Sequence, residues 1–212
     1  MSRYYTDALA VPLSMARPLL ILDADEVLLK FVDGFDRFLR ARDLFIDLTS
    51  YRLHGNVKRL DDLSPLIDVE VTALLDEFRA DLDSLTMVEG ARETLNALLP
   101  ATQIVVLSNV VPEQAEARLR NFASHGFDFP LVTNSGSKGA AVKALAGKAG
   151  KPAFFVDDIP QHLASAAKHA PEVFRIHIVG DERLKPLLPA AEDAHLRAET
   201  WADAEAFIRS KL

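Results

Sequence analysis

Two pairs of acidic residues each follow a short apolar run, and these residues have the clearest capacity for chemistry. Asp23 and Asp25 come directly after Leu19–Leu22, and Asp157 and Asp158 end a second apolar run. Carboxylates this close repel one another, so a divalent cation or a shared proton must offset their charge. Mg²⁺ is the natural counterion, because it takes oxygen ligands and is usually held by one or two carboxylates. If the fold brings the two pairs together, they predict a metal site.

Further residues have side chains suited to binding an anion. Ser108 and Asn109 follow the apolar run Ile104–Leu107 and offer a hydroxyl and an amide as hydrogen-bond partners for phosphate oxygens. Lys138 stands at the start of an expected helix, where the positive end of the helix dipole disfavours a cation unless an anion lies nearby. Lys143 is an alternative for the same role. These residue types predict a phosphate group bound near the acidic pairs.

The elements that must position these residues are strands alternating with helices. Short, continuously apolar runs are typical of buried parallel strands. The expected strands are Leu19–Leu22, Ile104–Leu107, Leu131–Val132, Ala153–Val156 and Phe174–Val179. The expected helices between the later strands are Glu113–Ala123, Lys138–Ala149 and Gln161–His169. This alternation predicts an α/β fold with a doubly wound parallel sheet, whose site lies outside the carboxyl ends of the strands.

The interval between the first two strands breaks this rhythm. Amphipathic patterns over Asp36–Phe45 and Val69–Leu82 predict two helices within it, and Glu89–Leu99 is typical of a crossover helix back to the sheet. We therefore expect a small helical cap over residues 30–85 and a core domain made of residues 18–29 and 86–212. Residues 1–17 are expected to form a loosely packed N-terminal leader.

Together these features resemble the motifs of the haloacid dehalogenase-like (HAD) hydrolase superfamily, most of whose members are phosphatases. The motifs occur in the family's order: Asp23–Val27 is similar to the first, Asp-x-Asp-x-(Thr/Val), Ser108 to the second, Lys138 to the third and Asp157-Asp158 to the acidic fourth. The resemblance runs from about residue 19 to residue 207, and the family also inserts a helical cap after its first motif. It implies a Rossmann-like core with a cap.

The resemblance also implies catalytic roles. Asp23 would be the nucleophile that forms an aspartyl-phosphate, and Asp25 would protonate the leaving oxygen and later deprotonate the hydrolytic water. Ser108 would hydrogen-bond a phosphoryl oxygen, while Lys138 would neutralise charge and orient Asp23. Asn109 is a weaker candidate for contacting the substrate.

The metal ligands that the resemblance implies come from the first and fourth motifs. Mg²⁺ would be held by Asp23, by the backbone at Asp25 and by Asp158, with Asp157 acting directly or through water. The commoner fourth motif, Gly-Asp-x-x-x-Asp, would place a second acid where this chain has His162. We interpret His162 as a residue of the helix surface, with contact to the metal ligands as the alternative.

The expected function is that of a Mg²⁺-dependent phosphatase acting on a small phosphorylated metabolite. Two alternatives stay open: a phosphate- or nucleotide-binding regulator with little turnover, and a haloacid dehalogenase. Asp25 favours the phosphatase, because the dehalogenase branch lacks an acid at this position. A basic segment over the site would favour an anionic substrate, and its candidates in the cap are Arg37, Arg40, Arg52, His54, Lys58 and Arg59. Most of these residues are nevertheless expected to lie on solvated helix faces.

The composition excludes other classes of function. Zero cysteines among 212 residues exclude a disulfide framework, thiolate metal sites and a cysteine nucleophile. A net charge of −7 argues against nonspecific binding to nucleic acid. The first apolar stretch is far shorter than the ~20 residues that a membrane span requires, and residues 1–17 lack the pattern of a signal peptide. We therefore expect a cytoplasmic protein without nucleic-acid or membrane partners.

Overall fold

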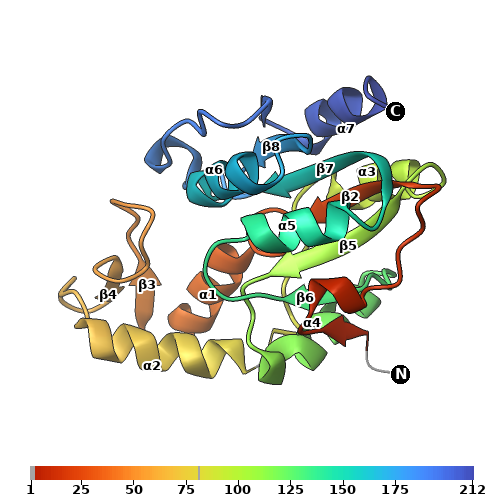
Figure 1. Ribbon diagram of the computed structural model, residues 1–212. Helices are drawn as coiled ribbons and strands as arrows, with labels where there is room; N and C mark the ends of the chain where they lie inside the picture. The colour runs from red at the N-terminus through yellow and green to blue at the C-terminus, as the bar shows by residue number, and fades with distance from the viewer. Residues whose placement is uncertain (1–2, 81) are drawn as a thin grey trace.

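A seven-stranded parallel sheet forms the centre of the computed structural model, which describes residues 3–80 and 82–212 (Figure 1). Its strands are β1 (Tyr4–Tyr5), β2 (Pro18–Leu22), β5 (Gln103–Ser108), β6 (Leu131–Thr133), β7 (Gly150–Asp157), β8 (Phe174–Ile178) and β9 (Leu196–Ala198). They lie in the order β1-β6-β5-β2-β7-β8-β9, and all neighbours are parallel. Because β2 is central, the chain winds outward from it in both directions. The doubly wound sheet expected from the sequence is confirmed.

Both faces of the central strands are buried, which explains their continuous hydrophobicity. Successive side chains of a strand point to opposite faces, so Leu20 and Leu22 contact one core while Leu19 and Ile21 contact the other. The helices over the first face are α3 (Ala91–Leu98), α4 (Pro112–Ser124) and α7 (Trp201–Arg209). Those over the second face are α5 (Gly139–Ala146) and α6 (Pro160–His169).

The segment between β2 and α3 forms a cap at one end of the sheet, seen at the left of Figure 1. It contains α1 (Phe31–Arg40), β3 (Leu44–Ile46), β4 (Val57–Arg59) and α2 (Asp68–Arg79). The ring of Phe78 joins the two helices, since it lies 5.2 to 5.4 Å from three phenylalanine rings of α1. The strands β3 and β4 pair antiparallel.

The cap also contains this hairpin, which the two expected cap helices did not include. The helix expected over Asp36–Phe45 ends at Arg40, and Asp43 adopts a left-handed backbone with φ 56° that turns the chain into β3. Leu44 and Ile46 are buried on the hairpin's inner face. The apolar residues near the end of α1 fit both the helical and the strand periodicity. Only pairing with β4 therefore decides between helix and strand.

The expected loosely packed leader is also corrected for its described part, residues 3–17. The edge strand β1 pairs with β6, and a 3-10 turn, η1 (Ala8–Ala10), packs against α5. Val11 is fully buried, and the Arg17 guanidinium donates to backbone carbonyls that follow α3. These contacts make residues 3–17 part of the core domain. Met1 and Ser2 lie outside the described residues.

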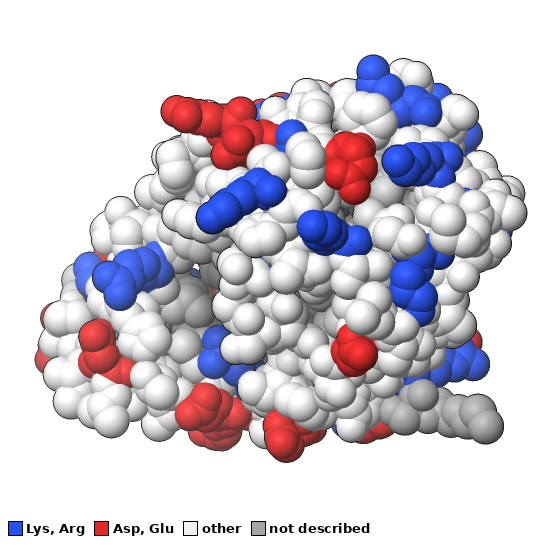
Figure 2. Space-filling model, viewed as in Figure 1, with Lys and Arg blue, Asp and Glu red and all other residues white. Residues whose placement is uncertain are grey.

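The surface in Figure 2 carries acidic and basic side chains interspersed over both the cap and the sheet domain. An ion pair between two such exposed side chains stabilises a fold by little, because water screens their charges. Within residues 3–80 and 82–212, no helix has the length and apolar character needed to cross a membrane.

Candidate active site

The carboxyl ends of two adjacent strands bring the acidic pairs together. Leu22 of β2 is level with Val156 of β7, so Asp23 and Asp157, each one residue farther on, emerge beside each other. Oxygen atoms of Asp23, Asp157 and Asp158 lie within 4.8 Å of one another. All three residues are buried, with 6%, 0% and 2% of their surfaces exposed. Residues more than a hundred positions apart in the sequence therefore form one acidic cluster.

Lys138 is the counterion of this cluster. Its Nζ atom lies 2.7 Å from Asp23 Oδ1 and 2.8 Å from Asp157 Oδ2. Burial would lower the pKa of the Lys138 ammonium, but Asp157 and Asp23 raise it above its ordinary value, so the group stays charged. Lys143 is exposed on α5. The structure thus places Lys138 in the site, and not its alternative.

The close packing of two helices holds Lys138 in place. Lys138 is the N-cap residue of α5, and the next residue, Gly139, contacts α6. A Cβ atom on Gly139 would lie 2.3 Å from the carbonyl oxygen of Ser165, so any larger residue would push the two helices apart. The dipeptide Lys138-Gly139 therefore combines the cation with the small residue that positions it.

The two fourth-motif carboxylates differ in their partners. Asp157 Oδ2 accepts from Lys138, and Asp157 Oδ1 accepts from the backbone N–H of Ile159 at 2.8 Å. Asp158 Oδ2 accepts from Tyr51, whereas Asp158 Oδ1 is buried and has no hydrogen-bond partner among the described residues. Burial raises the pKa of Asp157 to about 7 and raises that of Asp158 well above its ordinary value. An unpartnered oxygen among clustered carboxylates fits the donor set of Mg²⁺.

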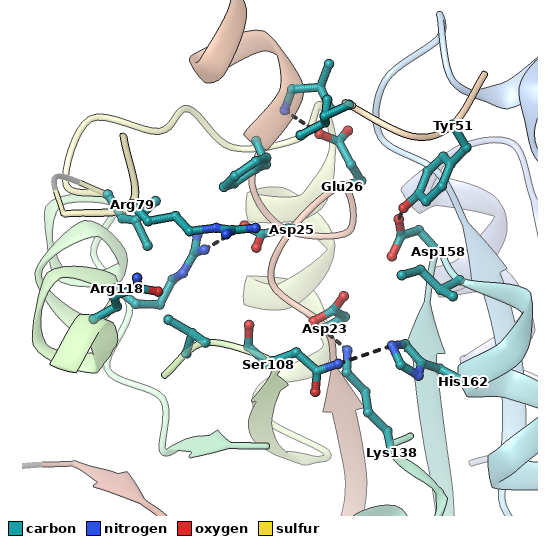
Figure 3. Close-up of a pocket in the computed structure, with 18 residues that line it drawn as sticks. Asp23, Asp25, Glu26, Tyr51, Arg79, Ser108, Arg118, Lys138, Asp158 and His162 are labelled. Atoms are coloured by element: carbon teal, nitrogen blue, oxygen red, sulfur yellow. Dashed lines mark hydrogen bonds and ion pairs between the residues drawn. The ribbon is translucent and has the colours of Figure 1, made fainter. Parts of the chain in front are cut away.

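Tyr51 is a site residue that the sequence analysis missed. It lies in the cap between β3 and β4, and its hydroxyl donates to Asp158 Oδ2 at 2.6 Å (Figure 3). Burial and the neighbouring Asp158 raise the pKa of the phenol, so it acts as a donor. This hydrogen bond ties the cap directly to the acidic cluster.

Replacing Tyr51 by Phe is expected to lower the free energy of unfolding by about 1–3 kcal/mol in metal-free buffer, because the bond to a carboxylate is lost and Oδ2 of Asp158 stays buried. Urea unfolding measures the change. Tyr4→Phe on the edge strand β1 is the matched control and should change stability by less than about 0.5 kcal/mol. Equal stabilities of the two variants would contradict a stabilising link between cap and core.

Asp25 forms an ion pair with a buried arginine. Arg118 Nη2 of α4 lies 2.6 Å from Asp25 Oδ1, and the side chains are 1% and 37% exposed. Desolvation raises the pKa of the Asp25 carboxyl, while Arg118 opposes the rise. Arg118 was also missed, because an arginine in an amphipathic helix usually lies on its solvated face.

Glu26 adopts a backbone conformation that favours glycine, with φ 56°. Its Oε1 accepts from the N–H of Val32 in the first turn of α1, and its Oε2 is buried without a partner among the described residues. Burial raises the pKa of Glu26 to about 8, with the Val32 hydrogen bond opposing the shift. The residue is therefore mostly protonated at neutral pH.

We expect Glu26→Gln to stabilise the protein relative to the wild type, and increasingly so as the pH rises. The unfolded chain loses the Glu26 proton near pH 4.5, whereas the folded chain keeps it to about 8. Between these values unfolding releases a proton, so wild-type stability falls by up to ~1.4 kcal/mol per pH unit. Glutamine stays neutral and still accepts from Val32. Urea unfolding near the two ends of this pH range tests it, and a difference that does not change with pH would disprove the shift.

A cavity of about 250 Å³ opens above the strand ends, between core and cap. Its core lining includes every site residue predicted from the sequence except Asp157, namely Asp23, Asp25, Ser108, Asn109, Lys138 and Asp158. The cap contributes Tyr51, Leu53, Arg79 and Leu82. Asp157 is fully buried and does not line the cavity, but it accepts a hydrogen bond from Lys138, which does.

Solved structures with this architecture match nearly the whole chain. A HAD-superfamily hydrolase of subfamily IA from Geobacter sulfurreducens has a TM-score of 0.57 and 20% identity, covering 92% of this chain and 98% of its own. A HAD family hydrolase from Deinococcus radiodurans, with bound phosphate and sodium, has a TM-score of 0.53 and 18% identity over 93% and 97%. An L-2-haloacid dehalogenase has a TM-score of 0.60 and 12% identity over 91% and 99%. The chain has the haloacid dehalogenase-like fold. Neither a protein-family model nor a curated protein sequence matches it.

His162 stands at the position where the resemblance would place a second acid of the commoner fourth motif. It lines the cavity, so its interpretation as a residue of the outer helix surface is wrong. Its Nε2 lies 3.5 Å from Asn109 Nδ2, and Asn109 itself donates to the Gly136 carbonyl. Burial lowers the pKa of His162 to about 4, so the ring is neutral near pH 7. It therefore adds no charge to the acidic cluster.

The basic cap residues named as candidates lie at exposed or half-buried positions away from the cavity, which agrees with the solvated faces expected for most of them. Four of them form ion pairs with acids of the cap itself: Arg37 with Asp33, Arg40 with Asp36, Lys58 with Asp47 and Arg59 with Glu70. None of the six candidates lines the cavity. The cap cation that does line it is Arg79, at the end of α2.

Proposed function

We propose that this protein is a Mg²⁺-dependent phosphatase that hydrolyses a small phosphate monoester through a phosphorylated Asp23. The observation that carries the proposal is the buried cluster of three carboxylates around Lys138, at the base of a cavity of about 250 Å³. An anionic nucleophile can approach an anionic phosphate only if nearby positive charge offsets their repulsion. This cluster provides one fixed cation and a donor set for a second.

Asp23 and the unpartnered Oδ1 of Asp158 would hold Mg²⁺. The backbone carbonyl of Asp25 is the further ligand that the resemblance implies. Both oxygens of Asp157 already accept hydrogen bonds, so Asp157 serves to hold Lys138. When bound, the cation supplies positive charge that stabilises the phosphoryl oxygens during transfer.

The first half of the reaction transfers the phosphoryl group to Asp23. A carboxylate oxygen of Asp23 forms a bond to phosphorus as the bond from phosphorus to the ester oxygen breaks. The leaving oxygen takes a proton from Asp25, a carboxyl group whose pKa is raised by desolvation. The Ser108 hydroxyl and the Lys138 ammonium bind the phosphoryl oxygens from the base of the cavity.

The second half releases inorganic phosphate. Asp25, now a carboxylate stabilised by Arg118, takes a proton from a water molecule as that water attacks phosphorus. The bond between phosphorus and Asp23 breaks and the nucleophile is regenerated. Acid–base help of this kind is worth ~10²–10⁴-fold in rate.

The proposal is tested by measuring inorganic phosphate released from a panel of small phosphate monoesters, with Mg²⁺ and with EDTA. We expect turnover of at least one ester that requires Mg²⁺. Chloride release from 2-chloropropionate without phosphate release would favour a dehalogenase. Tight binding of esters without hydrolysis would favour a regulator, and either result would overturn the proposal.

A further inference from the structure

Two arginines outside the four motifs line the same cavity. Arg118 belongs to α4 of the core, and Arg79 belongs to the last turn of α2 in the cap. Figure 3 shows both side chains projecting toward Asp25, on the opposite side of the cavity from Asp158 and His162. The cavity is therefore lined by acids around Lys138 on one side and by two guanidinium groups on the other.

Arg118 is buried with much of its hydrogen-bonding capacity unused. It is 1% exposed, and its Nη2 donates to Asp25. Its Nε and Nη1 atoms are buried without a hydrogen-bond partner among the described residues. A guanidinium is always charged, and an unsatisfied donor of a buried charge costs folding free energy. This arrangement favours a second acceptor that arrives with a ligand.

Arg79 faces the cavity with weak partners. Its nearest carboxylate among the described residues, on Asp76, lies 3.9 Å away and is 71% exposed. The ring of Phe31 lies 6.0 Å from its guanidinium carbon. Water screens so long and exposed a pair. Among the described contacts, none holds the Arg79 guanidinium away from a ligand.

The charges on this side of the cavity leave room for one more anion. Two guanidinium groups project toward Asp25, the proposed proton donor, and the apolar side chains of Phe31 and Leu82 also line the cavity. Because Arg118 is buried, a charge-assisted hydrogen bond to its guanidinium is strong. Arginine suits the task because its planar fork binds a carboxylate or phosphate through two hydrogen bonds.

We propose that Arg79 and Arg118 bind a second anionic group of the substrate, a carboxylate or a second phosphate. This inference rests on the proposed function and narrows its substrate to a small phosphate monoester with a second negative charge near the phosphoryl group. A cavity of about 250 Å³ suits a molecule of a few carbons. Because Arg79 comes from the cap and Arg118 from the core, such a ligand also draws the cap onto the core.

The test measures binding, which keeps it independent of turnover. Titration calorimetry with Mg²⁺ compares 3-phosphonopropionate with propylphosphonate, which has a methyl group in place of the carboxylate. Ethane-1,2-bisphosphonate has a second phosphonate in place of the carboxylate. None of the three has an ester bond to hydrolyse. We expect both doubly anionic ligands to bind ~10-fold or more tightly than propylphosphonate, and the tighter of the two identifies the second group.

Variants test whether the two arginines cause the tighter binding of the doubly anionic ligands. Arg79→Gln should reduce it to less than ~3-fold, and Arg118→Lys should reduce it because the fork is lost. If Arg118→Lys fails to fold, Arg79→Gln alone decides. The matched control is Arg120→Gln, also on α4, where Arg120 pairs with Asp83 at the surface and is 61% exposed. Its preference should equal that of the wild type.

The outcomes separate this inference from the proposed function. A binding preference without hydrolysis of any ester would support the anion site and overturn the phosphatase. Ester hydrolysis without the preference, or a preference that survives in Arg79→Gln, would overturn the anion site. Failure of all three phosphonates to bind would overturn it as well.

Discussion

Asp23→Asn is expected to lower kcat by ~10⁴-fold or more on any ester that the wild type hydrolyses. The amide is a poor nucleophile, and it also removes a negative charge from the acidic cluster. Asparagine has the shape of aspartate, and Lys138 keeps its 2.8 Å contact with Asp157, so the fold should persist. Steady-state phosphate release measures the loss, and circular dichroism checks the fold.

Two further variants sharpen this result. Asp128→Asn is the matched control, because Asp128 is 66% exposed on the surface and should leave kcat unchanged. Asp25→Asn should slow an alkyl phosphate more than p-nitrophenyl phosphate, since nitrophenolate leaves without a proton. Wild-type activity in Asp23→Asn would show that another group attacks phosphorus.

Lys138→Gln is expected to lower the free energy of unfolding by about 3–5 kcal/mol in metal-free buffer. The substitution removes the buried cation from between Asp23 and Asp157 and leaves their charges uncompensated. Lys143→Gln, on the exposed face of the same helix, should change it by less than about 0.5 kcal/mol. Urea unfolding of both variants gives the comparison.

Adding Mg²⁺ to Lys138→Gln tests in a second way whether positive charge stabilises the acidic cluster. Because a ligand that binds only the folded state stabilises it by mass action, Mg²⁺ should recover part of the stability lost in Lys138→Gln. Equal stability of Lys138→Gln and Lys143→Gln without metal would contradict the role assigned to the buried lysine.

The core sheet was predictable because its central strands are buried on both faces. Strands such as Pro18–Leu22 and Gly150–Asp157 therefore contain continuous apolar runs, and an acid follows each run. The edge strands β1 and β9 have only two and three residues, and their short patterns do not distinguish them from loops. They exist because β6 and β8 offer free edges for pairing. Pairing between distant segments has no local sequence signal.

The cap was only partly predictable for a related reason. Its two helices show amphipathic periodicity, but Leu44–Ile46 becomes a strand through register with Val57–Arg59. The identity of the cap residues over the site depends on how the cap sits on the core. Charge counts offered Arg37 and its neighbours only as candidates, whereas the fold turns Tyr51 and Arg79 toward the cavity.

Some candidate catalytic residues were predictable from the sequence, and others were not. Asp23, Ser108, Lys138 and Asp158 each end or follow a strand or begin a helix, so their positions follow from local pattern and resemblance. Arg118, in contrast, belongs to the candidate site because it contacts Asp25, which lies 93 positions away in the sequence. Such contacts arise only once the tertiary structure has formed.

Chemical trapping most directly tests whether Asp23 carries the phosphoryl group. The protein is mixed with p-nitrophenyl phosphate and Mg²⁺, quenched in acid and reduced with borohydride, which converts an aspartyl phosphate to homoserine. Using Asp25→Asn alongside the wild type slows the second half of the reaction and raises the trapped fraction. Peptide mass spectrometry should find homoserine at position 23, and only after incubation with substrate. Homoserine at Asp157 or Asp158 instead, or turnover with no homoserine at position 23, would contradict a phosphorylated Asp23.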